Sequence, residues 1–235
     1  MKIVFFTFYF PPDLSAGSFR SIAFSQSLKE RVKPGDKIDI ITSHPNRYKA
    51  HLIETQDVEF DEMITIHRIN VPSHTGSMFS QGYAFLIFAI SAFNLCRKIN
   101  PDFLIGTSSR LMTAALTWIS AIYLKKRYFI DLRDIFSETI SDIFMQKNRL
   151  LGLITKHFFI KLEKYVLNSA AGVNVVSEGF PEYFENNGID TSNWFFFPNG
   201  VDQNFVDFPA QKTGLKKSIK TILYAGNIGK GQGLE

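Results

Sequence analysis

Short apolar runs alternate with longer helical segments along this chain, and this alternation constrains the fold more than any other feature. The expected strands cover residues 3–8, 37–42, 63–69, 102–106, 127–132, 172–176 and 194–197. The expected helices lie between them, one beginning near residue 18 and others covering 78–99, 109–124, 150–168 and 178–187. This pattern predicts an α/β domain, a Rossmann-like parallel sheet with helices on both faces. Ligands of such sheets bind beyond the carboxyl ends of the strands, so the loops there should hold the site.

The composition is that of a globular protein, because 45% of the residues are hydrophobic and 20% are charged. A net charge of +4 suits anionic ligands such as nucleotide diphosphates, or an anionic membrane surface, and predicts neither by itself. No nucleic-acid partner is expected. Cys96 is the single cysteine, which excludes an internal disulfide and suits a reducing cytoplasm. No spacing of histidine, cysteine or carboxylate residues indicates a metal site.

Neither a signal peptide nor a transmembrane helix is expected. The N-terminal apolar run ends at Pro11 and Pro12 without a small-residue cleavage site, so a buried strand fits it better. The apolar window 83–93 is shorter than the about 20 residues that cross a bilayer. We therefore expect a cytoplasmic protein, with peripheral binding to the inner face of the cell membrane left open.

The loop after the first strand reads "FYFPPDLSAGSFRS" at residues 8–21. Its single glycine, Gly17, leaves too few positions of close approach for a dinucleotide-binding loop. The motifs described below resemble a family in which this loop borders a cleft, and the resemblance implies that Gly17 lets the backbone come near it. Ser18 is then expected to cap a helix whose amides point at a diphosphate, and Arg20 joins these two as a candidate for the same cleft.

The end of the sequence indicates a second domain. Residues 207–220 are polar and basic and are expected to form a linker after a domain that covers residues 1–206. Residues 221–235, "TILYAGNIGKGQGLE", predict a strand and a glycine-rich loop, with Gly229 as a candidate phosphate contact. The spacing is typical of the opening of a nucleotide-binding unit, and an ordinary turn remains the alternative.

Several of these stretches together resemble one family. They are "YFPPDLSAGSFR" (9–20), "FIDLRDIFSETI" (129–140), "LEKYVLNSAAGVNVVSEGFPEYFENNGI" (162–189), "FFFPNGVD" (195–202) and "ILYAGNIGKGQGLE" (222–235). In this order they look like retaining GT-B-fold glycosyltransferases of family 4, and are most similar to bacterial enzymes of capsule and O-antigen assembly. The resemblance covers the acceptor-side domain and the first residues of the donor-side domain.

The resemblance implies transfer of a sugar from a nucleotide-sugar to an acceptor, with retention at the anomeric carbon, in surface polysaccharide biosynthesis. The acceptor would be a saccharide, free or carried on a polyprenyl diphosphate, and no cofactor is needed. The nucleotide pocket and a pair of glutamates belong to the second domain of the family. The present chain is therefore expected to have little or no activity by itself.

The motif at residues 129–140 supplies the expected catalytic residues, Asp134 and Asp131. The resemblance places a polar residue beneath the transferred sugar here, where a carboxylate can bind sugar hydroxyls or stabilise positive charge. Arg133 and Glu138 are the neighbouring acceptor-side candidates. Many relatives read Asp-Leu-Trp-Pro-Glu-Ser where residues 134–139 read Asp-Ile-Phe-Ser-Glu-Thr, so the local turn differs. A helix cap and a surface ion pair are the alternative role for this motif.

Three further loops hold candidate residues that have equally good structural explanations. Ser177 and Glu178 follow a predicted strand and are candidates for the donor side of the cleft, or for a helix cap. Ser108 and His44 also follow strands and are acceptor candidates. An N-cap explains Ser108 as well, and an ordinary turn at residues 44–47 explains His44.

The helix expected at residues 150–168 has an apolar residue at every fourth position. This stripe is Leu150, Ile154, Phe158, Leu162 and Val166. Such a stripe is most simply a core face. Four basic residues lie outside it: Arg149, Lys156, Lys161 and Lys164. With Phe158 and Phe159 nearby, this flank also suits an anionic membrane.

Two other classes of function remain open from the sequence. A nucleotide-sugar epimerase of the same fold would act on the donor without an acceptor. A non-catalytic sugar- or lipid-binding module is the second alternative, favoured only if the natural protein ends near residue 235.

Overall fold

The computed structural model describes residues 1–46, 53–73, 78–108, 111–135, 137, 145, 148–200, 206–207 and 223–224. Contacts divide the chain into two units, Met1–Pro198 and Asn199–Glu235. Most of the second unit, including Gly229 and the expected linker after Asp207, lies outside the described residues. The domain boundaries expected from the sequence therefore stay predictions, and the fold described below is that of the first unit.

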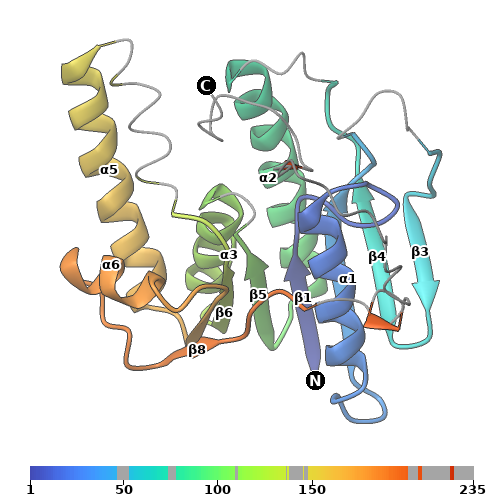
Figure 1. The fold of residues 1–235 in the computed structure, drawn as a ribbon. Coiled ribbons are helices and arrows are strands. Elements are labelled where there is room, and N and C mark those ends of the chain that lie inside the picture. The colour runs from blue at the N-terminus through green and yellow to red at the C-terminus, as the bar shows by residue number, and fades with distance from the viewer. Residues whose placement is uncertain are drawn as a thin grey trace, which may run out of the picture. The chain divides into compact units, whose positions relative to one another are not determined.

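The first unit is built on an eight-stranded sheet (Figure 1). The strands are β1 (Lys2–Phe6), β2 (Lys37–Ser43), β3 (Val58–Asp61), β4 (Ile64–Ile69), β5 (Phe103–Thr107), β6 (Arg127–Leu132), β7 (Gly172–Val175) and β8 (Trp194–Phe196). Their order in the described sheet is β3-β4-β2-β1-β5-β6-β7-β8. All neighbours are parallel except β3 and β4, which pair antiparallel. The predicted parallel α/β fold is confirmed. Of the strands in the described residues only β3 was missed, because its four exposed or half-exposed residues have no apolar run.

The helices of the described residues are α1 (Ala16–Lys29), α2 (Met78–Ile99), α3 (Leu111–Leu124), α5 (Arg149–Asn168) and α6 (Phe180–Asn186). Helices α2, α3 and α5 lie side by side on one face of the sheet, and α1 covers the other (Figure 1). Central strand β1 contributes Val4 and Phe6 to the core beneath α2 and α3, and Ile3 and Phe5 to the core beneath α1. A strand that is buried on both faces needs apolar residues at every position, which explains the continuous run at the N-terminus.

Helix α1 contacts the chain just after β1 through small buried residues. The buried residues of this helix are Gly17, Ser18, Ser21 and Ser25. The hydroxyl of Ser21 lies 2.8 Å from that of Thr7, just after β1. The helix begins two residues earlier than expected, at Ala16, and Ser15 caps it by accepting the Ser18 N–H at 3.1 Å. The expected cap at Ser18 is therefore wrong, since Ser18 is already in the first turn.

Helix α2 joins the core, although it is long and apolar enough to cross a membrane by length and composition alone. The apolar window at 83–93 is part of a 22-residue helix, so the argument from length does not hold. One face of α2 packs in the core cluster through Ala84, Phe85, Phe88, Ala92 and Cys96. This packing places one face of α2 in the core, while only 28% of its most apolar window is buried.

Helix α5 corrects a second expectation. Leu150, Ile154 and Phe158 are 67%, 59% and 61% exposed, whereas Val166 in the same stripe is fully buried. The 20-residue helix is about 30 Å long, but the four residues of β7 span only about 13 Å. Since the C-terminal end of α5 leads directly into β7, its N-terminal half extends past the sheet. The stripe is therefore a core face only in the second half of the helix.

Candidate functional site

The carboxyl ends of β5 and β6 bring several predicted site residues together beside the start of α1. Arg133 follows β6, and its backbone N–H donates to the Ser108 hydroxyl at 3.0 Å. Its Nη2 donates to the Ala16 carbonyl oxygen at 3.3 Å. The side chain of Arg20, on α1, pairs with Asp131 at the end of β6. Five candidates, Arg20, Ser108, Asp131, Arg133 and Asp134, thus surround one end of α1.

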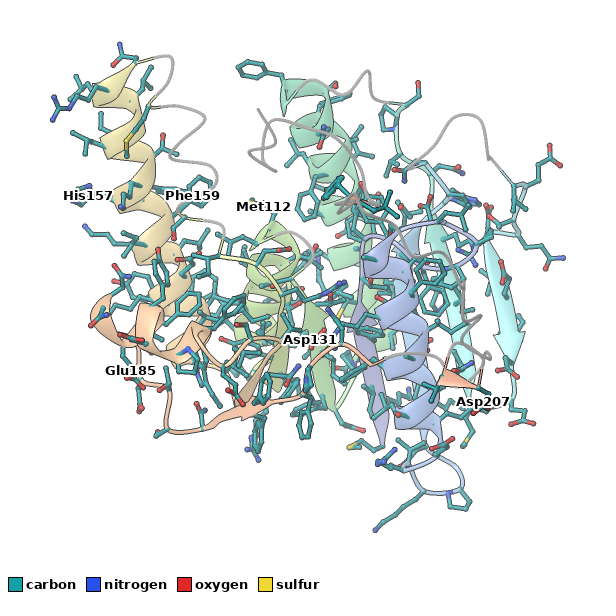
Figure 2. The ribbon with its side chains drawn as sticks, viewed as in Figure 1. Met112, Asp131, His157, Phe159, Glu185 and Asp207 are labelled. Atoms are coloured by element: carbon teal, nitrogen blue, oxygen red, sulfur yellow. The ribbon has the colours of Figure 1, made fainter. Side chains whose placement is uncertain are left out.

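Asp131 is the centre of a buried polar network (Figure 2). Arg20 donates to both carboxylate oxygens, through Nε at 2.8 Å and Nη2 at 2.7 Å. Asn174 of β7 donates to Oδ1 at 2.7 Å. Only 2% of Asp131 is exposed. A carboxylate that is held by three donors and shielded from solvent is suited to positioning other groups, and a catalytic role for Asp131 stays a prediction.

The same network holds the chain that leaves β8. Arg20 also donates to the carbonyl oxygens of Phe197 and Pro198, at 3.2 and 3.3 Å. Asn174 accepts the Phe197 N–H at 2.8 Å through its side-chain oxygen. We call Arg20, Asp131 and Asn174 the clamp, because they fix the last residues of the first unit to the ends of β6 and β7. Sequence reasoning missed Asn174, although a polar residue inside the strand "GVNV" was a usable signal.

Arg133 keeps part of its guanidinium group unpaired. Its Nε and Nη1 are buried and have no hydrogen-bond partner among the described residues. Burial lowers the pKa of Arg133, the charge of Asp131 opposes this, and Arg20 adds a second positive charge that lowers it further. A planar cation with unpaired N–H groups next to a second arginine is suited to bind an anion with several oxygens.

Asp134 is the second carboxylate of the motif and lies beside Arg133. Although Asp134 is exposed, the atoms packed around it remove enough water to raise the pKa of its carboxyl group, and the charge of Arg133 opposes this rise. Among the described residues its carboxylate has no hydrogen-bond partner, in contrast to Asp131. Of the two carboxylates, Asp134 is therefore the one more available to bind a ligand.

A buried contact to α5 and α6 anchors the loop that carries Arg133 and Asp134. Ser137 donates its backbone N–H to Glu163 Oε1 at 3.1 Å, and its hydroxyl lies 2.9 Å from that of Tyr183. A proline at this position, as in the family that the sequence resembles, has no N–H to donate. Ser137 therefore fits its surroundings in this chain. The candidate Glu138 lies outside the described residues.

The remaining candidates lie in other loops. Ser177 and Glu178 are exposed after β7, and α6 begins only at Phe180 with Gly179 at the N-cap position. The Ser177 hydroxyl accepts the Gly179 N–H at 3.4 Å, so Ser177 braces the turn and does not cap the helix as expected. Their donor-side role stays a prediction.

His44 is held by the segment before β3. Its Nδ1 lies 2.9 Å from the Thr55 hydroxyl, and its Nε2 lies 2.9 Å from Asp57 Oδ1. Together with Pro45, Ile53, Glu54, Thr55 and Asn70 it lines an open hollow of about 400 Å³. The described residues contain no group of three side chains that could hold a metal ion.

No family model and no curated protein matches the chain, so the comparisons with known proteins rest on solved structures. Sucrose-phosphate synthase from Thermosynechococcus elongatus is similar, with a TM-score of 0.59 and 12% identity over 86% of this chain and 49% of that chain. A second structure of this synthase matches over 88% of this chain and 93% of that chain, with a TM-score of 0.58 and 12% identity. HepE from Anabaena in complex with UDP-glucose has a TM-score of 0.48 and 14% identity, over 87% of this chain and 45% of that chain.

This chain spans about half the length of the first of these structures. At such low identity the likeness establishes the fold: the first unit has the architecture of a GT-B glycosyltransferase domain.

Proposed function

We propose that this chain is the acceptor-side domain of a glycosyltransferase that uses a nucleotide-sugar donor. The unpaired Nε and Nη1 of Arg133, next to the start of α1 at the carboxyl edge of the sheet, are the observation that carries this proposal. A helix N-terminus and an arginine together favour a diphosphate. The GT-B fold supports the proposal, since a sugar is moved from a diphosphate in this kind of enzyme.

The proposed reaction breaks the bond between the anomeric carbon and the diphosphate oxygen and forms a bond to an acceptor oxygen on the same face of the sugar. The acceptor proton leaves with the nucleoside diphosphate. Arg133 and the first amides of α1, at Ala16 and Gly17, would bind the negative charge that builds on the diphosphate. Asp134 would accept a hydrogen bond from the sugar or face its developing positive charge. Arg20 and Asp131 would hold this arrangement in place through the clamp.

The setting of the proposed reaction follows from the sequence resemblance. We propose a retaining enzyme of family 4, in surface polysaccharide biosynthesis of the capsule or O-antigen type. Its acceptor would be a saccharide carried on a polyprenyl diphosphate, reached at the inner surface of the cell membrane. The nucleotide pocket would belong to a second domain.

The test is donor use by the full-length protein, with and without substitution at Arg133. Arg133→Gln is expected to lower kcat/KM at least tenfold, since hydrogen bonds to a charged group are worth about 1.5–3 kcal/mol. Arg127→Gln is the matched control, because Arg127 is exposed at the opposite end of the same strand. Unchanged kcat/KM in Arg133→Gln would refute the assignment of the site.

The products of the same assay separate the rival functions. The anomeric configuration of the product, read by NMR, tests retention. Conversion of the donor sugar into its epimer in the absence of an acceptor would identify an epimerase. Donor or acceptor binding without any turnover of the full-length protein would identify a binding module.

A further inference from the structure

The N-terminal half of α5 carries a dense set of exposed apolar side chains. They are Leu150, Leu151, Leu153, Ile154 and Phe158, which are between 42% and 67% exposed. Scattered exposed apolar residues are normal on a protein surface, but a contiguous group on one helix indicates a binding surface. We call these five residues the overhang surface, because they lie on the part of α5 that extends past the sheet.

The geometry of the first unit explains why this surface has no cover from the sheet. Helix α5 contacts α3, and its second half joins the core, where Val166 and Leu167 are buried. Its N-terminal end lies at the top of the view in Figure 1, opposite the end next to α6. This is the edge where the parallel strands end, so the overhang surface lies at the same edge as Arg133 and Asp134.

The helix is also strongly basic on its surface. Its basic residues are Arg149, Lys156, Lys161 and Lys164. Its single acidic residue, Glu163, is 2% exposed and accepts the Ser137 N–H. No exposed carboxylate of α5 therefore offsets the positive charge. Apolar side chains together with uncompensated cations are typical of helices that lie on anionic membranes.

Neighbouring helices extend the apolar character of this edge. Met112 is 43% exposed at the start of α3, and Figure 2 shows it at the upper end of that helix, between α5 and α2. Phe79 and Tyr83 in the first two turns of α2 are 80% and 59% exposed. The N-terminal ends of three helices thus present apolar side chains toward the same side of the domain.

We propose that the overhang surface docks this protein on an anionic lipid bilayer, with the apolar residues in the headgroup region and the lysines on lipid phosphates. This inference deepens the membrane setting proposed above by naming the surface. The purpose of the docking rests on the proposed function, because docking would bring the carboxyl edge of the sheet to a membrane-borne acceptor. Lipid binding itself needs neither donor nor transfer, so it is measured separately from activity.

The experiment is co-sedimentation of the full-length protein with vesicles, without donor or acceptor. Vesicles of equal parts phosphatidylglycerol and phosphatidylcholine are compared with vesicles of phosphatidylcholine alone. We expect binding to the first kind that weakens with added salt, and little binding to the second. Absence of binding to the anionic vesicles would overturn the proposal, whether or not the protein transfers sugar.

The apolar contribution is tested by Leu150→Ser, Ile154→Ser and Phe158→Ser in one variant. Because these side chains are already exposed, the variant should fold, and an unchanged Tm verifies this. We expect the partition coefficient on anionic vesicles to fall at least tenfold. Phe60→Ser is the matched control, since Phe60 is 80% exposed on the edge strand β3. An equal loss of vesicle binding in the triple variant and in Phe60→Ser, or no loss in either, would contradict the proposal.

The charge contribution is tested by Lys156→Gln, Lys161→Gln and Lys164→Gln together. The partition coefficient on anionic vesicles is expected to fall about fivefold per lysine, in the range for cations next to an anionic membrane. The control replaces three exposed lysines near the opposite edge: Lys2, Lys37 and Lys98.

Light scattering of the apolar and charge variants decides whether a second copy of the chain covers the overhang surface instead of a membrane. A dimer of the wild-type protein that the apolar variant abolishes would overturn membrane docking.

Discussion

Removing the charge at the centre of the clamp should destabilise the first unit strongly. Asp131→Asn keeps the size of the side chain but leaves the Arg20 guanidinium without its carboxylate. The two side chains are only 3% and 13% exposed, so water cannot replace the lost partner. The amide also presents an N–H₂ group to one of the donors from Arg20 or Asn174, which creates a repulsive contact.

The size of the effect follows from burial and from the number of bonds. Breaking a buried ion pair by removing one partner costs about 3–5 kcal/mol. Arg20 keeps its bonds to the carbonyl oxygens of Phe197 and Pro198, so we expect the lower end, about 3 kcal/mol. For a protein of this size that corresponds to a fall in Tm of about 6–12 °C.

The assay is urea unfolding of the wild type, Asp131→Asn, Arg20→Gln and the double variant, which gives the coupling energy between the two positions. Asp61→Asn is the control, since Asp61 is 63% exposed and pairs with Lys29 at the surface. That pair should contribute little to stability, because solvent screens it. A loss below about 1 kcal/mol in Asp131→Asn, or a coupling energy near zero, would refute the positioning role of the pair.

Four further predictions concern other parts of the domain. Gly106→Ala should destabilise the protein by about 1–3 kcal/mol in urea unfolding, because the added Cβ would meet the Oγ1 and Cβ of buried Thr117 at 2.1 and 2.9 Å. Gly82→Ala should be neutral or stabilising, because its Cβ would meet nothing within 4 Å and α2 gains a better helix former; equal losses in the two variants would contradict the packing argument. Asp134→Asn should raise Tm at neutral pH, because a raised carboxyl pKa means that ionisation opposes folding, and this gain should vanish below the ordinary carboxyl pKa of 3.8; a gain that persists at acid pH would contradict the sign. Cys96 should resist thiol reagents at pH 8 until the protein unfolds, since burial, with a contribution from Asp39, raises its pKa to about 12; rapid labelling of the folded protein would disprove this.

The strands and helices that form the core were predictable because their signal is local. Strand β6 and helix α2 have the bounds that the sequence predicted, since continuous apolar runs identify buried parallel strands and long helices. The edge strand β3 was not predictable, because an exposed strand is defined by its partner β4 and has no pattern of its own. The cap of α1 shows the same limit on a smaller scale. Both Ser15 and Ser18 are suitable residues, and only the backbone decided between them.

The candidate site was likewise predictable from the sequence only in part. The sequence predicted that residues after β1, β5 and β6 would converge, because the carboxyl ends of parallel strands share one edge. It did not predict that Asp131 would pair with Arg20, 111 residues away, and with Asn174, 43 residues away. Those contacts make Asp131 a buried part of the clamp and leave Asp134 exposed, although both carboxylates belong to one short motif.

By itself, then, the sequence determined the α/β alternation, the edge of the sheet where a site lies and the motif that supplies its charged residues. Only the tertiary structure decided which of those residues are already held by hydrogen bonds within the protein and which apolar surfaces remain exposed. Helix α5 shows the reason. Its apolar stripe repeats every four residues from Leu150 to Val166, but the sheet beneath it is shorter than the helix, so one half is core and the other half is surface. Periodicity reports which residues share a face, whereas burial depends on what lies opposite that face.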